Sequence, residues 1–319
     1  MQVTFWGTRG SLPTPVRADA VQQKVVSALL SANGQSFESE AAAARFAEET
    51  LAFPERSTYG GATSCVEIAL GSDQYLVCDM GSGLREFALD SMRRSAGGHS
   101  KTYNFLMSHL HWDHIMGFPF FTPAFDPEAT VRVYGGHHEL ETALRRQQEK
   151  ISFPVPFDWL KAHFEFNTLT PGERTEIAGA EVELIEQEHD NKSFGYRVAL
   201  DGKSVVYCTD LEHKLENMSQ EEDFVVFLRD ADVVIFDTMY SLSEAITMKQ
   251  DWGHSSNVVA VDLCHRAEVD RLIMFHHEPA HDDETIHRIH RETIRYEELT
   301  RTGRPLKVLC AYDGYQVSV

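Results

Sequence analysis

The chain contains one stretch that gathers metal-binding side chains, Ser108-His109-Leu110-His111-Trp112-Asp113-His114. It places three imidazoles and a carboxylate within six positions, directly after the apolar run Tyr103-Asn104-Phe105-Leu106-Met107. That run is typical of a buried β-strand, so we expect the motif on the loop at the strand's carboxyl end. A tight loop can direct these side chains to one point, whereas helical spacing would spread them around a cylinder. Imidazole and carboxylate are ligands for divalent first-row metals, so the stretch predicts a metal site rather than a polar surface loop.

The pattern His109-x-His111-x-Asp113-His114 resembles the signature of the metallo-β-lactamase superfamily. The rest of the chain is similar to the phosphodiesterase-like branch of that superfamily, which includes Z-type tRNA 3′-processing ribonucleases and small cyclic phosphodiesterases. The resemblance implies an α+β fold, the four-layer αβ/βα sandwich. Because no internal linker rich in Gly, Pro and Ser is present, we expect a single metallo-hydrolase domain over residues 1–319.

The order of apolar runs agrees with such a sandwich. Strands are expected at 3–6, 66–70, 74–79, 103–107, 131–134, 164–169, 180–186, 194–200, 204–208, 233–237, 272–275, 308–310 and 315–319. Helices are expected at 84–94, 137–150, 256–266 and 283–301. Strand-rich blocks thus alternate with helices in two halves, which favours two sheets packed face to face with helices outside.

Residues 16–56 follow a different pattern. Val21, Val25 and Leu29 recur at helical spacing, and Asn33-Gly34 separates them from a second helical segment. We predict a helical hairpin inserted near the N-terminus, where many relatives have a short loop. Its role as a lid over the pocket, as a contact in a homodimer or as neither stays open.

Composition limits the other classes of function. The apolar fraction of 42% suffices for a sizeable core, and no run approaches the length of a membrane span. The N-terminus shows no basic segment followed by an apolar one, and five cysteines without metal-type pairing fit a reducing cytoplasm. The net charge of −20, without a long basic patch, argues against binding long nucleic acids, so we expect a small anionic substrate.

The resemblance also implies a ligand set for two divalent metal ions. His109, His111 and His189 are expected to hold one ion, Asp113, His114 and His276 the other, and Asp210 is expected to bridge them. Zinc is the default metal, although manganese or iron would accept the same ligands. His277 competes with His276, but alternation along a strand would point the two side chains in opposite directions. Trp112 is expected to pack rather than coordinate.

Two residues are predicted to act in catalysis. Trp252-Gly253-His254-Ser255-Ser256 resembles a Gly-His-Ser block of the Z-type ribonucleases, so His254 is the expected general acid or phosphate contact. Asp113 is expected to orient the nucleophile or accept its proton. The resemblance thus implies hydrolysis of a phosphodiester, in a small or cyclic nucleotide, by attack of a metal-bound hydroxide. The alternatives are a thioester or other ester or amide hydrolase, a di-iron redox domain, and a non-catalytic sensing module.

Several further residues have open roles at this stage. Arg9 would contact an anionic substrate or form a structural salt bridge, and Asp79 and Ser82 would cap a helix or belong to an anion-binding loop. His137 and His138 are interpreted as a helix cap and a surface pair. The aromatic segments 117–121 and 153–157 would serve as core, pocket wall or cleft lining. Residues considered as supports near the site are His213, Asp237, Tyr240, His281 and Asp282.

Overall fold

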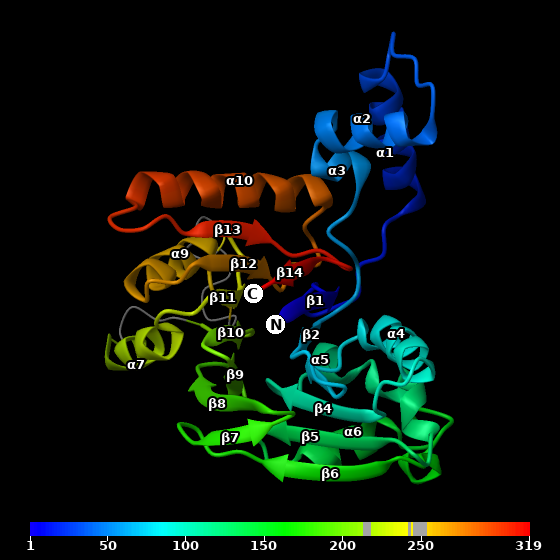
Figure 1. The fold of residues 1–319 in the computed structure, drawn as a ribbon, viewed down its shortest axis with the longest axis vertical. Coiled ribbons are helices and arrows are strands. Elements are labelled where there is room, and N and C mark those ends of the chain that lie inside the picture. Colours follow the sequence, from blue (N-terminus) through cyan, green and yellow to red (C-terminus); the bar gives the residue numbers. More distant parts are fainter. Residues whose placement is uncertain (213–217, 242–243, 245–253) are drawn as a thin grey trace.

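The computed structural model describes residues 1–212, 218–241, 244 and 254–319, and these residues form two seven-stranded sheets (Figure 1). The strands of the first sheet are, in spatial order, β14 (Gln316–Ser318), β1 (Gln2–Gly7), β2 (Cys65–Ala69), β3 (Tyr75–Cys78), β4 (Thr102–Met107), β5 (Thr130–Gly135) and β6 (His163–Thr168). The run from β3 to β6 is parallel. The carboxyl ends of these strands therefore meet at one edge.

The second sheet repeats this plan. Its strands are, in order, β13 (Lys307–Cys310), β12 (Arg271–Phe275), β11 (Val233–Asp237), β10 (Lys203–Cys208), β9 (Ser193–Leu200), β8 (Ala180–Gln187) and β7 (Arg174–Ile177). The run from β10 to β13 is parallel, and β7 to β10 is an antiparallel meander.

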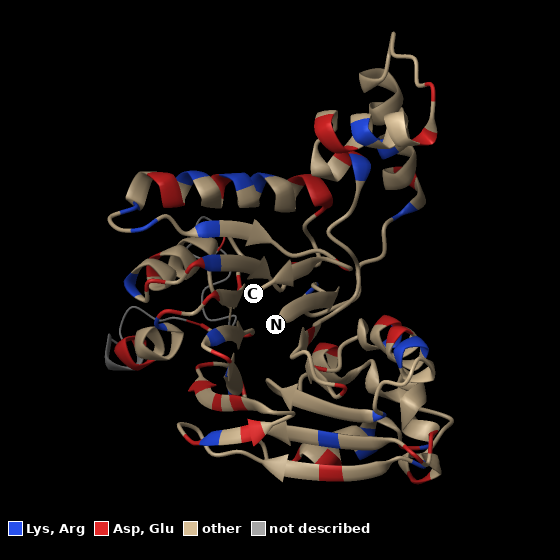
Figure 2. Ribbon diagram, in the orientation of Figure 1, with Lys and Arg blue, Asp and Glu red and all other residues tan. Residues whose placement is uncertain are grey.

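Helices cover the outer faces. The first sheet carries α4 (Leu84–Ala96), α5 (Trp112–Ile115), α6 (Leu140–Gln147) and the short turns η1 (Phe118–Phe120), η2 (Thr122–Phe125) and η3 (Phe157–Trp159). The second carries α7 (Met218–Leu228), α9 (Asn257–Arg266) and α10 (Asp283–Thr300). Figure 2 shows charged residues along α10, and the buried residues of this helix include Ile286 and Ile289.

Three apolar clusters fill the spaces between the layers. Val3, Phe5 and Val66 of the first sheet pack with Ile235 and Phe275 of the second, which makes the central core. A second cluster joins α4 and α6 to the first sheet, and a third joins α7, α9 and α10 to the second sheet. Because burial of apolar area is the main favourable term in folding, these clusters fix the four layers. The predicted αβ/βα sandwich is confirmed.

Residues 16–56 form α1 (Ala18–Ser31), α2 (Glu40–Thr50) and α3 (Phe53–Arg56). In Figure 1 these helices project from one end of the sandwich. The Lys24 ammonium ties α1 to α10 through an ion pair with Asp283, with Nζ and Oδ2 2.8 Å apart. Helices thus occur where the sequence predicts them, whereas the status of the segment as an insertion stays a prediction.

Other predictions needed correction. The expected helix over 137–150 is shorter, because it begins at Leu140, after His137 and His138, and ends at Gln147. Strand β7 and helix α7 were not predicted, since Arg174–Ile177 is short and polar and α7 shows weak amphipathic periodicity. Among the helices in the described part of the chain, none combines the length and apolarity needed to cross a bilayer.

Candidate metal centre

The predicted ligand residues lie at the carboxyl ends of strands that belong to both sheets. His109 and His111 follow β4, and Asp113 and His114 lie in α5, directly after them. From the second sheet, His189 follows β8, Asp210 follows β10 and His276 follows β12. Since the two sheets pack face to face, these ends converge at one edge of the sandwich.

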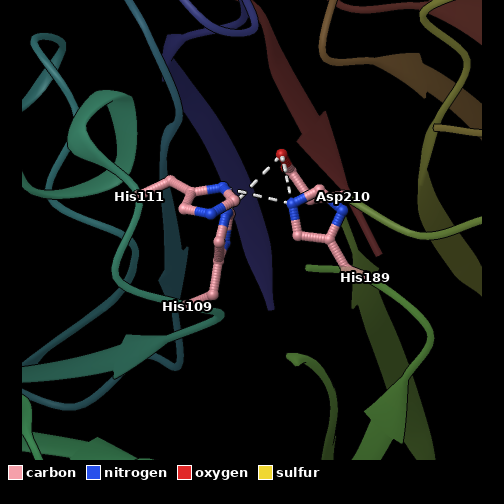
Figure 3. A group of neighbouring side chains, drawn as sticks. All are labelled: His109, His111, His189 and Asp210. Atoms are coloured by element: carbon pink, nitrogen blue, oxygen red, sulfur yellow. Dashed lines mark hydrogen bonds and ion pairs between the residues drawn. The ribbon is translucent and has the colours of Figure 1, made fainter. Parts of the chain in front are cut away.

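One group of donors, which we name the three-histidine cluster, consists of His109, His111, His189 and Asp210 (Figure 3). One ligand atom from each residue lies within 4.8 Å of the others. His111 Nδ1 and His189 Nε2 are 3.2 Å apart, and His109 Nε2 is 3.7 Å from Asp210 Oδ2. His109 is buried, whereas His111 and His189 are partly exposed.

A second group, which we name the two-aspartate cluster, consists of Asp113, His114, Asp210 and His276, all buried. His114 Nε2 lies 3.2 Å from Asp113 Oδ2 and 3.1 Å from Asp210 Oδ1. His276 Nε2 also lies 3.1 Å from Asp210 Oδ1. Asp210 therefore presents one oxygen to each cluster, which is the arrangement expected of a bridging ligand.

The donor sets fit divalent cations. The buried Nε2 atoms of His109, His114 and His276 make no hydrogen bond in the described part of the chain. Each of them faces a carboxylate oxygen at 3.1 to 3.7 Å. Buried ring nitrogens without hydrogen bonds are costly unless they coordinate a metal, and imidazole with carboxylate is a zinc-type donor set.

Asp79 supports the two-aspartate cluster through the Nδ1 atom of His114. Its Oδ2 accepts hydrogen bonds from His114 Nδ1 at 2.8 Å and from the hydroxyls of Ser108 and Tyr207, each at 2.7 Å. Its Oδ1 accepts from the Ser108 backbone N–H at 2.7 Å. A carboxylate on Nδ1 fixes the tautomer that leaves Nε2 for a metal. The helix-capping interpretation of Asp79 was wrong, and Ser82 does not cap either, since it accepts from the Thr63 N–H and Gly83 occupies the cap position of α4.

Three site residues have left-handed backbone conformations. Asp79, Asp210 and His276 have φ values of +60°, +49° and +61°, and each lies just beyond the end of a strand. Such values are uncommon for residues other than glycine and mark positions held by their surroundings. The left-handed conformation bends the backbone where each strand ends, and the side chain of each residue lies in the site. The sequence did not predict these conformations.

The loop after β1 closes one side of the two-aspartate cluster. The Ser11 N–H donates to Asp113 Oδ2 at 2.8 Å, and a Cβ on Gly10 would meet His276 Nδ1 at 2.7 Å. Arg9 is buried and donates to the backbone carbonyls of Gly60, Glu278 and His281. These hydrogen bonds hold the loop in place. Among the described residues Arg9 therefore has a structural role through backbone carbonyls, and both sequence-based interpretations, a substrate contact and a salt bridge, were wrong.

His254 and Asp237 form a pair next to the clusters. His254 Nδ1 donates to Asp237 Oδ2 at 2.8 Å, and the His254 ring lies 5.2 Å from the ring of His276 and 5.6 Å from that of His189. Tyr240 packs edge-on against the His254 ring. Trp252 and Gly253, which belong to the predicted block, lie outside the described residues.

The electrostatics of the two clusters differ. Burial lowers the pKa of His109 well below its ordinary value, and the charge of His114 adds to this. Burial also disfavours the imidazolium of His114, but Asp210, Asp113 and Asp79 outweigh burial and raise its pKa well above the ordinary value. Burial of His254 opposes its charge as well, yet Asp237 outweighs burial and raises the pKa of His254 to about 9.

Other predicted residues lie elsewhere. His277 is buried with Nε2 2.9 Å from the Ala311 carbonyl, and burial lowers its pKa to about 3, so it turns away from the clusters as predicted. His281 Nε2 contacts Glu244, and Asp282 caps α10 by accepting from the Thr285 N–H. His213 lies outside the described residues. Trp112 is 65% exposed, so its expected packing role was wrong.

Two sheets packed in a sandwich, with histidines and aspartates meeting at strand ends, define the class of metallo-β-lactamase-fold proteins. The family model of the beta-lactamase superfamily domain matches residues 78–277, which is more than half of the chain. The chain therefore belongs to the beta-lactamase superfamily, a fold family of mostly metal-dependent hydrolases.

Individual relatives are more distant. A curated ribonuclease Z from Prochlorococcus marinus is 35% identical over 78 residues, which are 24% of this chain and 22% of that protein. Unliganded yeast PDE1 matches with a TM-score of 0.66 and 14% identity, covering 99% of this chain and 98% of that chain. Zn²⁺-bound PqqB from Methylobacterium extorquens matches with a TM-score of 0.64 and 14% identity over 100% of both chains. At these identities the two structures show a shared fold.

Proposed function

We propose that the protein is a dinuclear-metal-dependent hydrolase of phosphodiesters that acts on a small or cyclic nucleotide. The observation that carries the proposal is the sharing of Asp210 between two donor clusters, with the His254–Asp237 pair beside them. Two sets of donors that share one carboxylate suit two cations a few ångströms apart. The site of a solitary structural ion would have a single closed set of four ligands.

In this proposal His109, His111 and His189 hold one ion, Asp113, His114 and His276 hold the other, and Asp210 bridges them. When bound, a pair of zinc ions supplies Lewis acidity toward a phosphoryl oxygen and lowers the pKa of a coordinated water. Manganese or iron would supply similar chemistry with the same ligands.

The residues of the chain supply orientation and proton transfer. The Ser11 N–H donates a hydrogen bond to the Asp113 carboxylate. Burial would raise the pKa of Asp113, but the nearby charge of His114 outweighs burial and lowers it. Asp113 thus remains an acceptor that can orient the nucleophile. His254 directs Nδ1 to Asp237, so its Nε2 can donate a proton to the leaving oxygen. A raised pKa keeps that proton in place at neutral pH.

Two observations favour a small phosphodiester. The curated relative is by name a ribonuclease, and ribonucleases cleave phosphodiesters. The net charge of −20 opposes contact with many phosphates of a long nucleic acid. Paired cations in the site would still attract one phosphate group, because bound ions dominate the local field.

The test is His254→Ala on the zinc-loaded protein, with a 2′,3′-cyclic nucleotide and bis-p-nitrophenyl phosphate as substrates. Loss of a general acid should lower turnover of the cyclic nucleotide by about 10²-fold. It should lower turnover of the p-nitrophenyl ester less, because p-nitrophenolate leaves without a proton. Zinc content, measured by plasma mass spectrometry, should stay unchanged.

His163→Ala removes an exposed histidine on β6 and is the matched control, expected to behave as wild type. A β-lactam and a thioester complete the substrate panel. Preferred hydrolysis of either over both diesters, or equal loss on both diesters in His254→Ala, would contradict the proposal.

A further inference from the structure

A pocket of about 690 Å³ adjoins the metal-binding motif. Its wall includes Leu110 and Trp112, which flank the ligand residue His111 in the chain. Phe120 and Phe153 continue the wall, and their rings pack edge to face at 5.6 Å. The volume lies in the range of small-molecule sites.

Two aromatic side chains of this wall are largely exposed. Trp112 is 65% exposed and Phe120 is 58% exposed, although Asp113 and His114, next in the chain, are buried. Exposed aromatic area of this kind is unfavourable in water and favours a planar apolar occupant. The wall therefore offers stacking surfaces within the same loop and helix that present the metal ligands.

One cation lies in the same wall. Arg146 lines the pocket and forms no ion pair with any described residue, whereas its neighbour Arg145 is paired with Glu141 and Asp158. Glu139, also in the wall, supplies a hydrogen-bond acceptor. In a chain with a net charge of −20, a guanidinium that shares a pocket wall with aromatic rings and has no ion pair among the described residues favours a ligand with acceptor atoms.

We propose that this pocket binds the heteroaromatic base of the substrate, stacked against Trp112, with Arg146 donating to the acceptor atoms of the base. The inference rests on the proposed function and adds the site that would recognise the base of that substrate. Leu110 and Trp112 line the pocket and flank His111 in the chain, so a nucleoside whose base occupies the pocket would extend its phosphate toward the clusters. Base–aromatic stacking tolerates any base, so the pocket selects nucleosides as a class.

The experiment compares two diesters with the same leaving group on the zinc-loaded protein. Thymidine 5′-(p-nitrophenyl phosphate) carries a base, and methyl p-nitrophenyl phosphate does not. The measured quantity is the ratio of their kcat/KM values. In Trp112→Ala this ratio should fall by about tenfold or more, equivalent to about 1.4 kcal/mol of lost stacking.

Further variants separate stacking from other effects. Trp112→Phe should keep most of the ratio because it retains an aromatic face, and Arg146→Ala should lower it by about threefold to tenfold. Trp159→Ala removes a tryptophan that is 60% exposed and lies outside the pocket wall, so its ratio should match wild type. An unchanged ratio in Trp112→Ala, or an equal loss on both diesters, would overturn the proposal. Conversion of a dimer to a monomer by Trp112→Ala in gel filtration would assign the pocket to a second copy of the chain and overturn it as well.

A binding measurement distinguishes failure of the pocket from failure of the proposed function. If the wild type hydrolyses neither diester, the proposed function fails, and calorimetric titration of the metal-free protein with thymidine 5′-monophosphate still tests the pocket. Binding that weakens about tenfold in Trp112→Ala supports the base site. Absent binding, or equal binding in both proteins, rejects it.

Discussion

The three-histidine cluster and the two-aspartate cluster share Asp210 but differ in support and in exposure. In the two-aspartate cluster every member is buried, Asp79 holds His114, and the Ser11 N–H holds Asp113. In the three-histidine cluster His111 and His189 are partly exposed. The half of the centre formed by the two-aspartate cluster is thus buried, whereas the half formed by the three-histidine cluster contains two partly exposed residues, of which His111 lies in the chain between the pocket-lining Leu110 and Trp112. The difference suggests tight metal retention in the first half and substrate access through the second.

The largest expected effect comes from the residue that both clusters share. Asp210→Ala should lower diester hydrolysis by about 10³-fold, the upper range for loss of one group that stabilises the developing charge. Zinc content should fall from two ions toward none, since each cluster loses a donor. Plasma mass spectrometry after dialysis measures this, and full retention of zinc would show that Asp210 bridges nothing.

Asp79→Asn should weaken zinc binding in the two-aspartate cluster and leave zinc binding in the three-histidine cluster unchanged. The amide fills the same space, but its uncharged oxygen is a weaker acceptor for the His114 Nδ1 proton than a carboxylate, so the affinity of the two-aspartate cluster for zinc should fall about 10- to 100-fold. The three-histidine cluster should keep its affinity. Asp190→Asn, an exposed carboxylate next to His189, is the control and should bind as wild type. Equal weakening of both zinc-binding steps in calorimetry would refute the difference in support.

Gly10→Ala tests how tightly the buried half is packed. The new Cβ would clash with Met239 Cε and would lie 2.6 Å from His276 Cε1, so both the methionine side chain and the imidazole must shift. Overpacking of this kind costs about 1 to 3 kcal/mol of stability, and the shift should weaken zinc binding in the two-aspartate cluster. Gly303→Ala adds a Cβ in open space and serves as control. Thermal unfolding with and without zinc measures both effects, and a variant indistinguishable from the control would disprove this contact.

The smallest effect is a difference in pH dependence. In the metal-free protein the carboxylates keep a proton on His114 at neutral pH, because its pKa is raised, whereas His109 is neutral because its pKa is lowered. Zinc must displace the His114 proton, so affinity of the two-aspartate cluster should rise about tenfold per pH unit. Affinity of the three-histidine cluster should vary less above pH 7. Titrations in buffers of different ionisation enthalpy count the released protons, and equal release in both steps would contradict the assignment.

The sequence predicted the candidate ligand residues better than their surroundings. Histidines and aspartates at the ends of apolar runs converge because parallel strands end at one edge, a rule that needs no coordinates. Together with the resemblance to the superfamily, which implied the ligand set, it pointed to the residues from His109 to His276 that the structure brings together. Short or polar elements such as β7 and α7 left no comparable pattern.

The supporting residues could not be predicted because their roles depend on long-range packing. Asp79 resembles a helix cap in the chain, and only the approach of Tyr207 from the other sheet shows it as the carboxylate behind His114. Gly10 resembles an ordinary loop glycine until His276 lies against it. The exposure of Trp112 could not be predicted either, because a tryptophan between candidate ligand residues resembles a core residue in sequence.

Anomalous X-ray diffraction at the zinc absorption edge, on crystals grown with zinc, tests the central claim most directly. The account predicts two strong peaks per chain. One should lie among His109, His111 and His189, the other among Asp113, His114 and His276, and Asp210 should contact both. A single peak, or peaks away from these side chains, would contradict it.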